Sequence, residues 1–157
     1  VYKRQEHATA DLFDDKVVVL TPDDSVNAGL LEKTEHFWRL CGGVSIQMPA
    51  SEHDAHLAAI SHVPHLVSAL VARMTIVDAL PLVGSGWKDI TRVAAGDPSL
   101  WTAICQENRD AIRTQLRRFA DELGGLRRIL DDGDDDLLMA WFTEAKKVKD
   151  QTQSTGS

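Results

Sequence analysis

The sequence predicts a mostly α-helical protein that begins with a small α/β segment. Two short apolar runs, Lys16–Leu20 and Val44–Met48, flank one helical pattern, which is the order of a β-α-β unit. Beyond Pro49 the apolar residues recur at every third or fourth position as far as Val148. We therefore divide the chain into residues 1–49, the remainder of an α/β domain, residues 50–150, a helical domain, and residues 151–157, a polar tail without structure.

The α/β segment has recognisable boundaries. Lys16–Leu20 is an apolar run rich in β-branched residues, which suits a parallel strand covered on both faces. The apolar spacing of Ser25–Cys41 predicts a helix, and Gly42-Gly43 is expected to end it. Val44–Met48 alternates like a second strand. Because this segment is too short for a complete sheet, we expect the other strands upstream.

The helical part is predicted to begin at Glu52, with Ser51 or one of its neighbours as its cap. The stretch Leu57–Leu80 is strongly apolar, and Pro64 is expected to kink or break the helix there. The glycines of Gly84–Gly86 predict a loop.

Two further helices are predicted towards the end of the chain. Asp97 and Pro98 form a typical helix start, and one apolar face continues to Leu123, where Gly124-Gly125 is expected to weaken or break the helix. The acidic stretch Asp131–Asp136 precedes a last helix, where the helix dipole favours negative charge.

Composition restricts the classes of function. The net charge of −7 argues against nucleic acid and anionic membrane surfaces as partners. Leu57–Val83 is long enough to cross a membrane, but Arg73, Asp78 and two prolines favour a buried helix of a soluble, oligomeric protein. Cys41 and Cys105 do not make a disulfide framework, so a reducing cytoplasm is expected.

Four histidines lie close together in the sequence. On a regular helix His53 faces away from His62, and His56 faces away from His65, so no metal site is predicted. His62 and His65 flank Pro64 on a very apolar helix, where two imidazoles need hydrogen-bond partners. A packed pair at a kink and a functional pair remain equally open.

A second polar cluster spans Gly84–Arg92 and combines two cations, a carboxylate, a hydroxyl and an indole. Lys88 and Arg92 are four residues apart, so they share a face if a helix begins here. Arginine binds a carboxylate through two parallel hydrogen bonds. The spacing is equally compatible with such a clamp and with a solvated helix start that has an ion pair to Asp89.

Five segments, in this order and at these separations, resemble the prephenate/arogenate dehydrogenases over nearly all of residues 10–149. The segments are Ala10-Asp11-Leu12-Phe13 with Val17–Pro22, Glu52-His53-Asp54, Ser61-His62-Val63-Pro64-His65, Gly86-Trp87-Lys88-Asp89-Ile90-Thr91-Arg92, and Asp97–Trp101 with Asn108-Arg109.

The resemblance implies a Rossmann-type dinucleotide-binding domain, of which residues 1–49 are the last β-α-β unit, and a helical domain through which two subunits form a homodimer. It implies oxidative decarboxylation of a small dicarboxylate with NAD or NADP. Prephenate gives 4-hydroxyphenylpyruvate in this reaction, and arogenate gives tyrosine.

The resemblance also implies roles for single residues. Arg92 is expected to hold a substrate carboxylate, and His65 and His62 to line the substrate site. Lys88 and Asp89 are expected at the mouth of the site, with Trp101 as a neighbour that comes from the same subunit or from its partner.

No catalytic residue is assigned in this chain. The family's glycine-rich phosphate loop and its catalytic histidine, which precedes a proline, are expected upstream, and His7 is followed by Ala8 instead. We read Val1–Gln5, which lacks an initiator methionine, as a truncation, and expect no appended tyrosine-regulated domain. The segment alone is expected to be inactive. The alternatives are a non-catalytic helical dimerisation or binding module and a different dehydrogenase of the same two-domain design.

Overall fold

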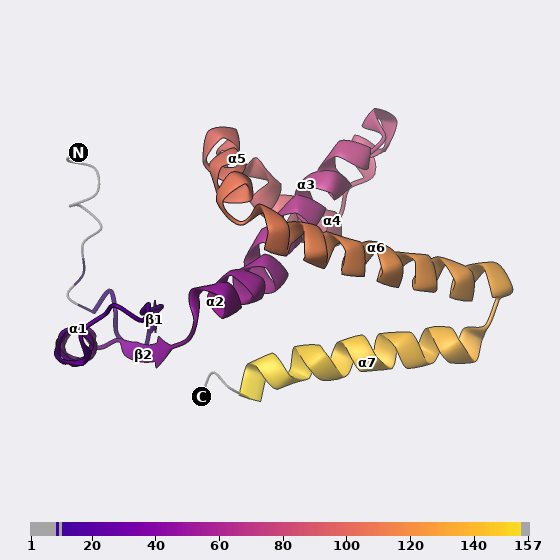
Figure 1. The fold of residues 1–157 in the computed structure, drawn as a ribbon. Helices are drawn as coiled ribbons and strands as arrows, with labels where there is room; N and C mark the ends of the chain where they lie inside the picture. Colours follow the sequence, from indigo (N-terminus) through magenta and orange to yellow (C-terminus); the bar gives the residue numbers. More distant parts are fainter. Residues whose placement is uncertain (1–8, 10, 155–157) are drawn as a thin grey trace. The chain divides into compact units, whose positions relative to one another are not determined.

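The computed structural model describes residues 9 and 11–154, and these form a mostly helical fold with one two-stranded parallel sheet (Figure 1). The predicted fold class is confirmed. The chain divides into two compact units after Ile112. The predictions made for Val1–Gln5 and His7 lie outside the described residues. The predicted domain boundary between residues 49 and 50 stays a prediction.

The α/β segment consists of β1 (Val17–Leu20), α1 (Ala28–Leu40) and β2 (Val44–Gln47). The strands pair in parallel with Val17 opposite Val44, which confirms the predicted β-α-β unit. Gly42 ends the helix region with φ 86°, a conformation that favours glycine, and a Cβ there would lie 2.0 Å from the Asp14 carboxylate.

Helix α1 begins three residues later than predicted. Asp23 accepts hydrogen bonds from the backbone and hydroxyl of Ser25, which closes a turn instead of a helix. Asn27 then caps the helix by accepting from the Gly29 amide at 2.9 Å.

Within this chain the first strand is half-buried, so the prediction that it is covered on both faces stays a prediction. Val17 is exposed, and so are Val44 and Ile46 of the neighbouring strand. The physical reason is that, among the described residues, one partner strand and one helix lie on this sheet, so most of its surface has no cover.

A long helix follows, in three parts: α2 (Ala50–Leu57), the π-helical turn η2 (Ala58–His62) and α3 (Val63–Met74). Pro49 occupies the position before the helix and no side chain caps it, so the predicted cap at Ser51 is wrong. The predicted disturbance at Pro64 is confirmed as this π turn, in which the Val63 amide bonds to the Ala58 carbonyl. Proline has no amide hydrogen, so the regular hydrogen-bond ladder is interrupted beside it.

The combined helix Ala50–Met74 is, among the described residues, the one helix long and apolar enough to cross a membrane. Length and composition alone are weak support for a span, since the core helix of a soluble protein passes the same test. The helix ends at Met74, short of the predicted Leu80, and a 3-10 helix η3 (Val77–Leu82) follows.

In the single chain this helix is largely exposed, so its predicted burial within an oligomer stays a prediction. Ile60 and Met74 are 74% and 72% exposed, and Leu70 is half exposed. Covering these side chains therefore requires something other than this chain's own described residues.

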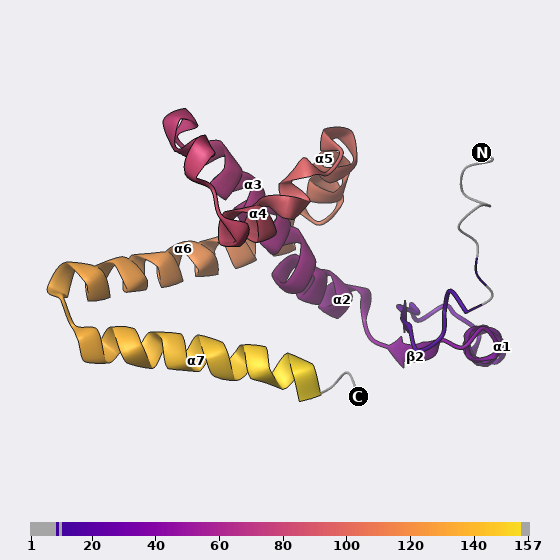
Figure 2. The same cartoon turned by 180° about the vertical axis from the view of Figure 1, so that it is seen from behind.

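Helix α4 (Ser85–Thr91) and the 3-10 helix η4 (Arg92–Ala95) pack against α3. Figure 2 shows α4 crossing α3. Gly84 is the residue before α4, so the predicted loop Gly84–Gly86 is wrong at its last two positions, which are helical. The Trp87 indole donates to the Thr75 hydroxyl at 2.9 Å and ties the start of α4 to the end of α3.

The predicted long helix is in fact two helices, α5 (Pro98–Glu107) and α6 (Arg109–Asp132), with a break at Asn108. Asp97 caps α5 as predicted, and its carboxylate accepts from the Ser99 and Leu100 amides. Gly124-Gly125 does not break α6, which continues to Asp132.

The last helix, α7 (Asp135–Ser154), follows Gly133, which has φ 65°. Its predicted acidic start is confirmed, since Asp134 accepts a hydrogen bond from the Leu137 amide. The helix extends through Gln151 to Ser154, so the predicted tail is wrong for residues 151–154; the Thr152 hydroxyl donates to the Lys149 carbonyl at 2.7 Å within this last part. Residues 155–157 lie outside the described residues.

Replacing Asp97 by Asn should change how stability depends on pH. Hydrogen bonds from the Ser99 hydroxyl and then from the Leu100 and Ser99 amides hold the pKa of Asp97 below its usual value of 3.8. A lowered folded-state pKa adds stability above the unfolded pKa and loses it as the pH falls through the folded one. We expect the wild type to melt above Asp97→Asn at neutral pH and to lose this advantage below pH 3.8. Parallel melting curves at all pH values would contradict it.

Candidate functional site

The buried centre of the first unit lies where the π turn meets α3. Ala58, Val63 and Ile112 form its apolar core. Five polar side chains are also buried in the described chain: His62, His65, Ser68, Thr91 and Asn108. Buried polar groups require partners or a function, so this cluster is the starting point for the site.

His65 is stacked on Trp101 of α5, with ring centroids 3.4 Å apart and planes inclined by 15°. His62, one helical turn earlier, meets the same indole edge to face at 6.3 Å and 82°. The two histidines that flank Pro64 thus converge on one aromatic ring from within the same chain. Both are nearly buried, with 9% and 8% of their surfaces exposed.

Gly96 leaves the space for this aromatic stack. A Cβ at Gly96 would lie 2.6 Å from the Trp101 indole nitrogen and 2.9 Å from the His65 Cε1 atom. Sequence reasoning missed Gly96, since a single glycine before an Asp-Pro helix start looks like an ordinary linker.

His62 has a second buried neighbour, the side chain of Asn108. The Asn108 Nδ2 atom lies 3.2 Å from His62 Nδ1 and donates to the Asp54 carbonyl at 2.8 Å. Sequence reasoning used Asn108 only as part of the resemblance and gave it no role. Its position between two helices could not be read from apolar spacing.

Burial lowers the pKa of His65 and is the main cause of a lowered pKa at His62. The charge of Asp54 opposes the shift at His62, while His53 adds to it. Both imidazoles are therefore neutral at neutral pH and can donate or accept hydrogen bonds without carrying charge.

The three charged candidates lie at the surface. Lys88, Asp89 and Arg92 are all exposed. In the described part of the chain none of them forms an ion pair, so the alternative of a Lys88–Asp89 or Arg92–Asp89 pair is not supported. Their elements α4 and η4 pack against α3, which carries His65. The structure therefore brings His62, His65 and Trp101 together directly, and relates the charged residues to them only through this packing.

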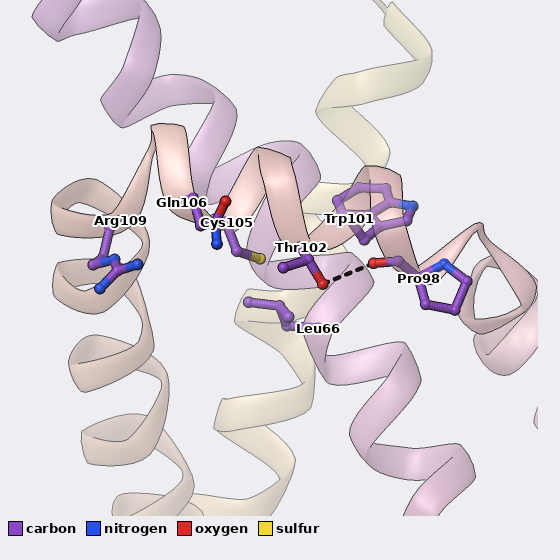
Figure 3. Close-up of a pocket in the computed structure, with 7 residues that line it drawn as sticks. All are labelled: Leu66, Pro98, Trp101, Thr102, Cys105, Gln106 and Arg109. Atoms are coloured by element: carbon purple, nitrogen blue, oxygen red, sulfur yellow. Dashed lines mark hydrogen bonds between the residues drawn. The ribbon is translucent and has the colours of Figure 1, made fainter.

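Two open pockets lie at this cluster, one lined by Trp101 and the other by His62. One, of about 450 Å³, is lined by Leu66, Pro98, Trp101, Thr102, Cys105, Gln106 and Arg109 (Figure 3). The Arg109 guanidinium lies at one end of it and the Trp101 indole at the other. The second, of about 430 Å³, contains both His53 and His62. The expectation that these two histidines face apart is wrong, because the π turn changes the helical phase between them.

The segment is a poor fit for the phosphates of a dinucleotide. In Rossmann-type domains a glycine-rich turn between strand and helix receives them. Here the connection from β1 to α1 contains Asp23 and Asp24 and no glycine, and Asn27 already occupies the helix N-terminus. Two carboxylates at this place repel phosphate.

The fold is similar to that of solved dehydrogenases. Over 94% of its length, this chain superposes on the prephenate dehydrogenase of A. aeolicus, which was solved in complex with hydroxyphenyl propionate and NAD+. The TM-score is 0.85 and the sequence identity is 27%. Over 90% of its length, it superposes on the Synechocystis arogenate dehydrogenase, with a TM-score of 0.82 and 25% sequence identity. In each case it spans 54% of the solved chain.

Sequence comparison gives the family. The profile described as "Prephenate dehydrogenase, dimerization domain" matches residues 49–144. The cyclohexadienyl dehydrogenase of Zymomonas mobilis is 33% identical over 147 residues, which are 89% of this chain and 50% of that protein. The prephenate dehydrogenase of Bacillus subtilis is 28% identical over 145 residues, which are 88% of this chain and 39% of that protein. The chain belongs to the prephenate dehydrogenase dimerization-domain family, and it spans about half the length or less of these relatives.

Proposed function

We propose that this chain is the dimerisation and substrate-binding half of a prephenate or arogenate dehydrogenase. The proposed reaction is the NAD- or NADP-dependent oxidative decarboxylation of prephenate to 4-hydroxyphenylpyruvate, or of arogenate to tyrosine, in the cytoplasm. The buried pair of neutral histidines on Trp101 carries this proposal, because Trp101 lines one open pocket and His62 lines another.

The residues of this chain bind and orient the substrate in this proposal. Prephenate and arogenate each carry two carboxylates, while the protein has a net charge of −7, so the cations that attract these substrates must be local. Arg92 and Lys88 supply such cations at the surface of the elements that pack on α3. The substrate ring then packs against an uncharged surface, which is formed by His65, His62 and Trp101 and adds no further charge to the site.

The cofactor is assigned to the rest of the longer protein. When bound, NAD or NADP supplies the hydride acceptor of such a reaction. The acidic β1–α1 connection of this segment is unsuited to its phosphates, so residues outside the segment must hold them. Loss of carbon dioxide makes the substrate ring aromatic, which drives the overall reaction.

Replacing Arg92 by Ala tests the substrate site. In the full-length protein that carries this segment, the variant should raise KM for prephenate or arogenate about tenfold and leave KM for the cofactor unchanged. The expected effect is moderate because Arg92 is exposed and its attraction is screened by water. Steady-state kinetics with each substrate varied in turn gives both constants.

Arg127→Ala is the matched control, since Arg127 is also exposed but belongs to the second unit. It should leave both KM values unchanged. An unaltered substrate KM in Arg92→Ala would remove Arg92 from the site. Absence of any turnover by the full-length wild type with both substrates would instead favour the non-catalytic module.

A further inference from the structure

Asn108 is placed in the protein interior by the break between α5 and α6. Its backbone, with φ −110° and ψ 34°, departs from helical geometry. Its amide nevertheless bonds to the Ile104 carbonyl, and its carbonyl accepts from the Ile112 amide, both at 3.1 Å. The two helices thus stay connected through Asn108 while its buried side chain turns towards the π turn and α2.

The hydrogen bonds fix the orientation of the Asn108 amide. A backbone carbonyl can only accept a hydrogen bond, so the group 2.8 Å from the Asp54 carbonyl must be the amide nitrogen. The second hydrogen of that nitrogen is directed to His62 Nδ1 at 3.2 Å. A ring nitrogen that accepts a hydrogen bond carries no proton, so the single proton of neutral His62 must be on Nε2.

We propose that Asn108 is a positioning residue that holds His62 as the neutral Nε2–H tautomer, so that His62 presents a hydrogen-bond donor to a substrate oxygen. The part that concerns the substrate rests on the proposed function. The part that concerns the tautomer rests only on the geometry of Asn108, His62 and the Asp54 carbonyl.

The surroundings of His62 are consistent with a neutral ring. The charged or titratable groups that share its pocket are His53 and Asp54 on α2 and Glu107 at the end of α5. His53 lies 3.1 Å from the Asp54 carboxylate, so this carboxylate already has a partner. Protonation of His62 on Nδ1 would also direct a hydrogen at the Asn108 amide hydrogens, which opposes the charged form.

Nitrogen-15 NMR of histidine-labelled protein measures the tautomer directly. The chain has six histidines, and His62→Gln identifies the His62 signals by their loss. At neutral pH we expect an unprotonated Nδ1 and a protonated Nε2 for His62. A protonated Nδ1 in the wild type would overturn the proposal, and this spectrum decides the question even if a variant fails to fold.

Asn108→Asp supplies the second arm. A carboxylate accepts hydrogen bonds, so this variant should move the proton of His62 to Nδ1 and raise the pH at which the ring becomes charged. Asn27→Asp makes the same change at the exposed cap of α1, where Asp caps as well as Asn, and should leave the His62 signals unaltered. An Nε2–H tautomer retained in Asn108→Asp would show that Asn108 does not set it.

Kinetics of the full-length protein test the link to the substrate. Asn108→Ala should raise KM for prephenate or arogenate about tenfold, with the cofactor KM unchanged, because one hydrogen bond to the substrate is no longer oriented. An unchanged KM would overturn the role in substrate binding. If Arg92→Ala and His62→Gln are also without effect while the tautomer is as expected, the substrate-binding role proposed for this segment fails and the tautomer assignment stands.

Discussion

Gly96→Ala should destabilise the protein by about 1–3 kcal/mol, the usual cost of inserting a methyl group into a filled space. The added Cβ would meet the Trp101 indole at 2.6 Å and the His65 ring at 2.9 Å, so the stack must separate to admit it. The backbone of Gly96, with φ −61° and ψ 155°, is accessible to alanine, so any loss is due to the contact and not to the conformation. Urea unfolding followed by tryptophan fluorescence measures the change.

Gly86→Ala is the matched control for this experiment. Gly86 lies inside α4, and apart from its chain neighbours and its own helix backbone nothing described lies within 4 Å of the position where its Cβ would be. Alanine there should stabilise the protein by about 0.4–1 kcal/mol through the lower entropy of the unfolded chain. Equal stabilities of Gly96→Ala and Gly86→Ala would show that the aromatic stack tolerates the extra methyl group.

The chain should be a dimer in solution, and Phe142→Asp should weaken that dimer about 100-fold. Phe142 on α7 is 59% exposed. Other large apolar residues of the same unit are also exposed, namely Leu123, Leu130, Leu137, Met139 and Val148. A surface of this kind is covered in a stable protein, and the family match names a dimerization domain. An unpaired charge buried in the interface costs on the order of 3 kcal/mol.

Light scattering over a range of concentrations measures the dimerisation constant. Lys147→Glu is the control, because position 147 lies about 140° around α7 from Phe142 at 100° per residue and also changes the charge. It should leave the dimerisation constant nearly unchanged. A wild-type chain that stays monomeric at high concentration would refute the prediction.

Features with a local cause were predictable from the sequence. The β-α-β order, the glycine that ends α1 and the Asp97 cap each depend on a few consecutive residues. The predicted break at Gly124-Gly125 failed because two glycines cost only about 1 kcal/mol each relative to alanine, which the surrounding 24-residue amphipathic helix can absorb.

Features with a tertiary cause were not predictable in the same way. Asn108 interrupts a continuous apolar spacing, and what holds it there is the Asp54 carbonyl, 54 residues away in the sequence. The pairing of His65 with Trp101 likewise joins two helices that no local pattern relates. The resemblance named both residues as site neighbours, while the contact between them and the space left by Gly96 came only from the structure.

The π turn at Ala58–His62 has a practical consequence for protein engineering. A helical wheel drawn through all of Ala50–Met74 assigns the wrong side to one half of it, because the turn adds a residue to the count. Designs that substitute residues on the outer surface of this helix, or link it covalently to another helix, should number the parts before and after the π turn separately. Because the π turn already holds an extra residue, it is also the natural site for a single-residue insertion or deletion. Such a change would rotate the part of the helix on one side of the turn about its axis and leave the other part unchanged.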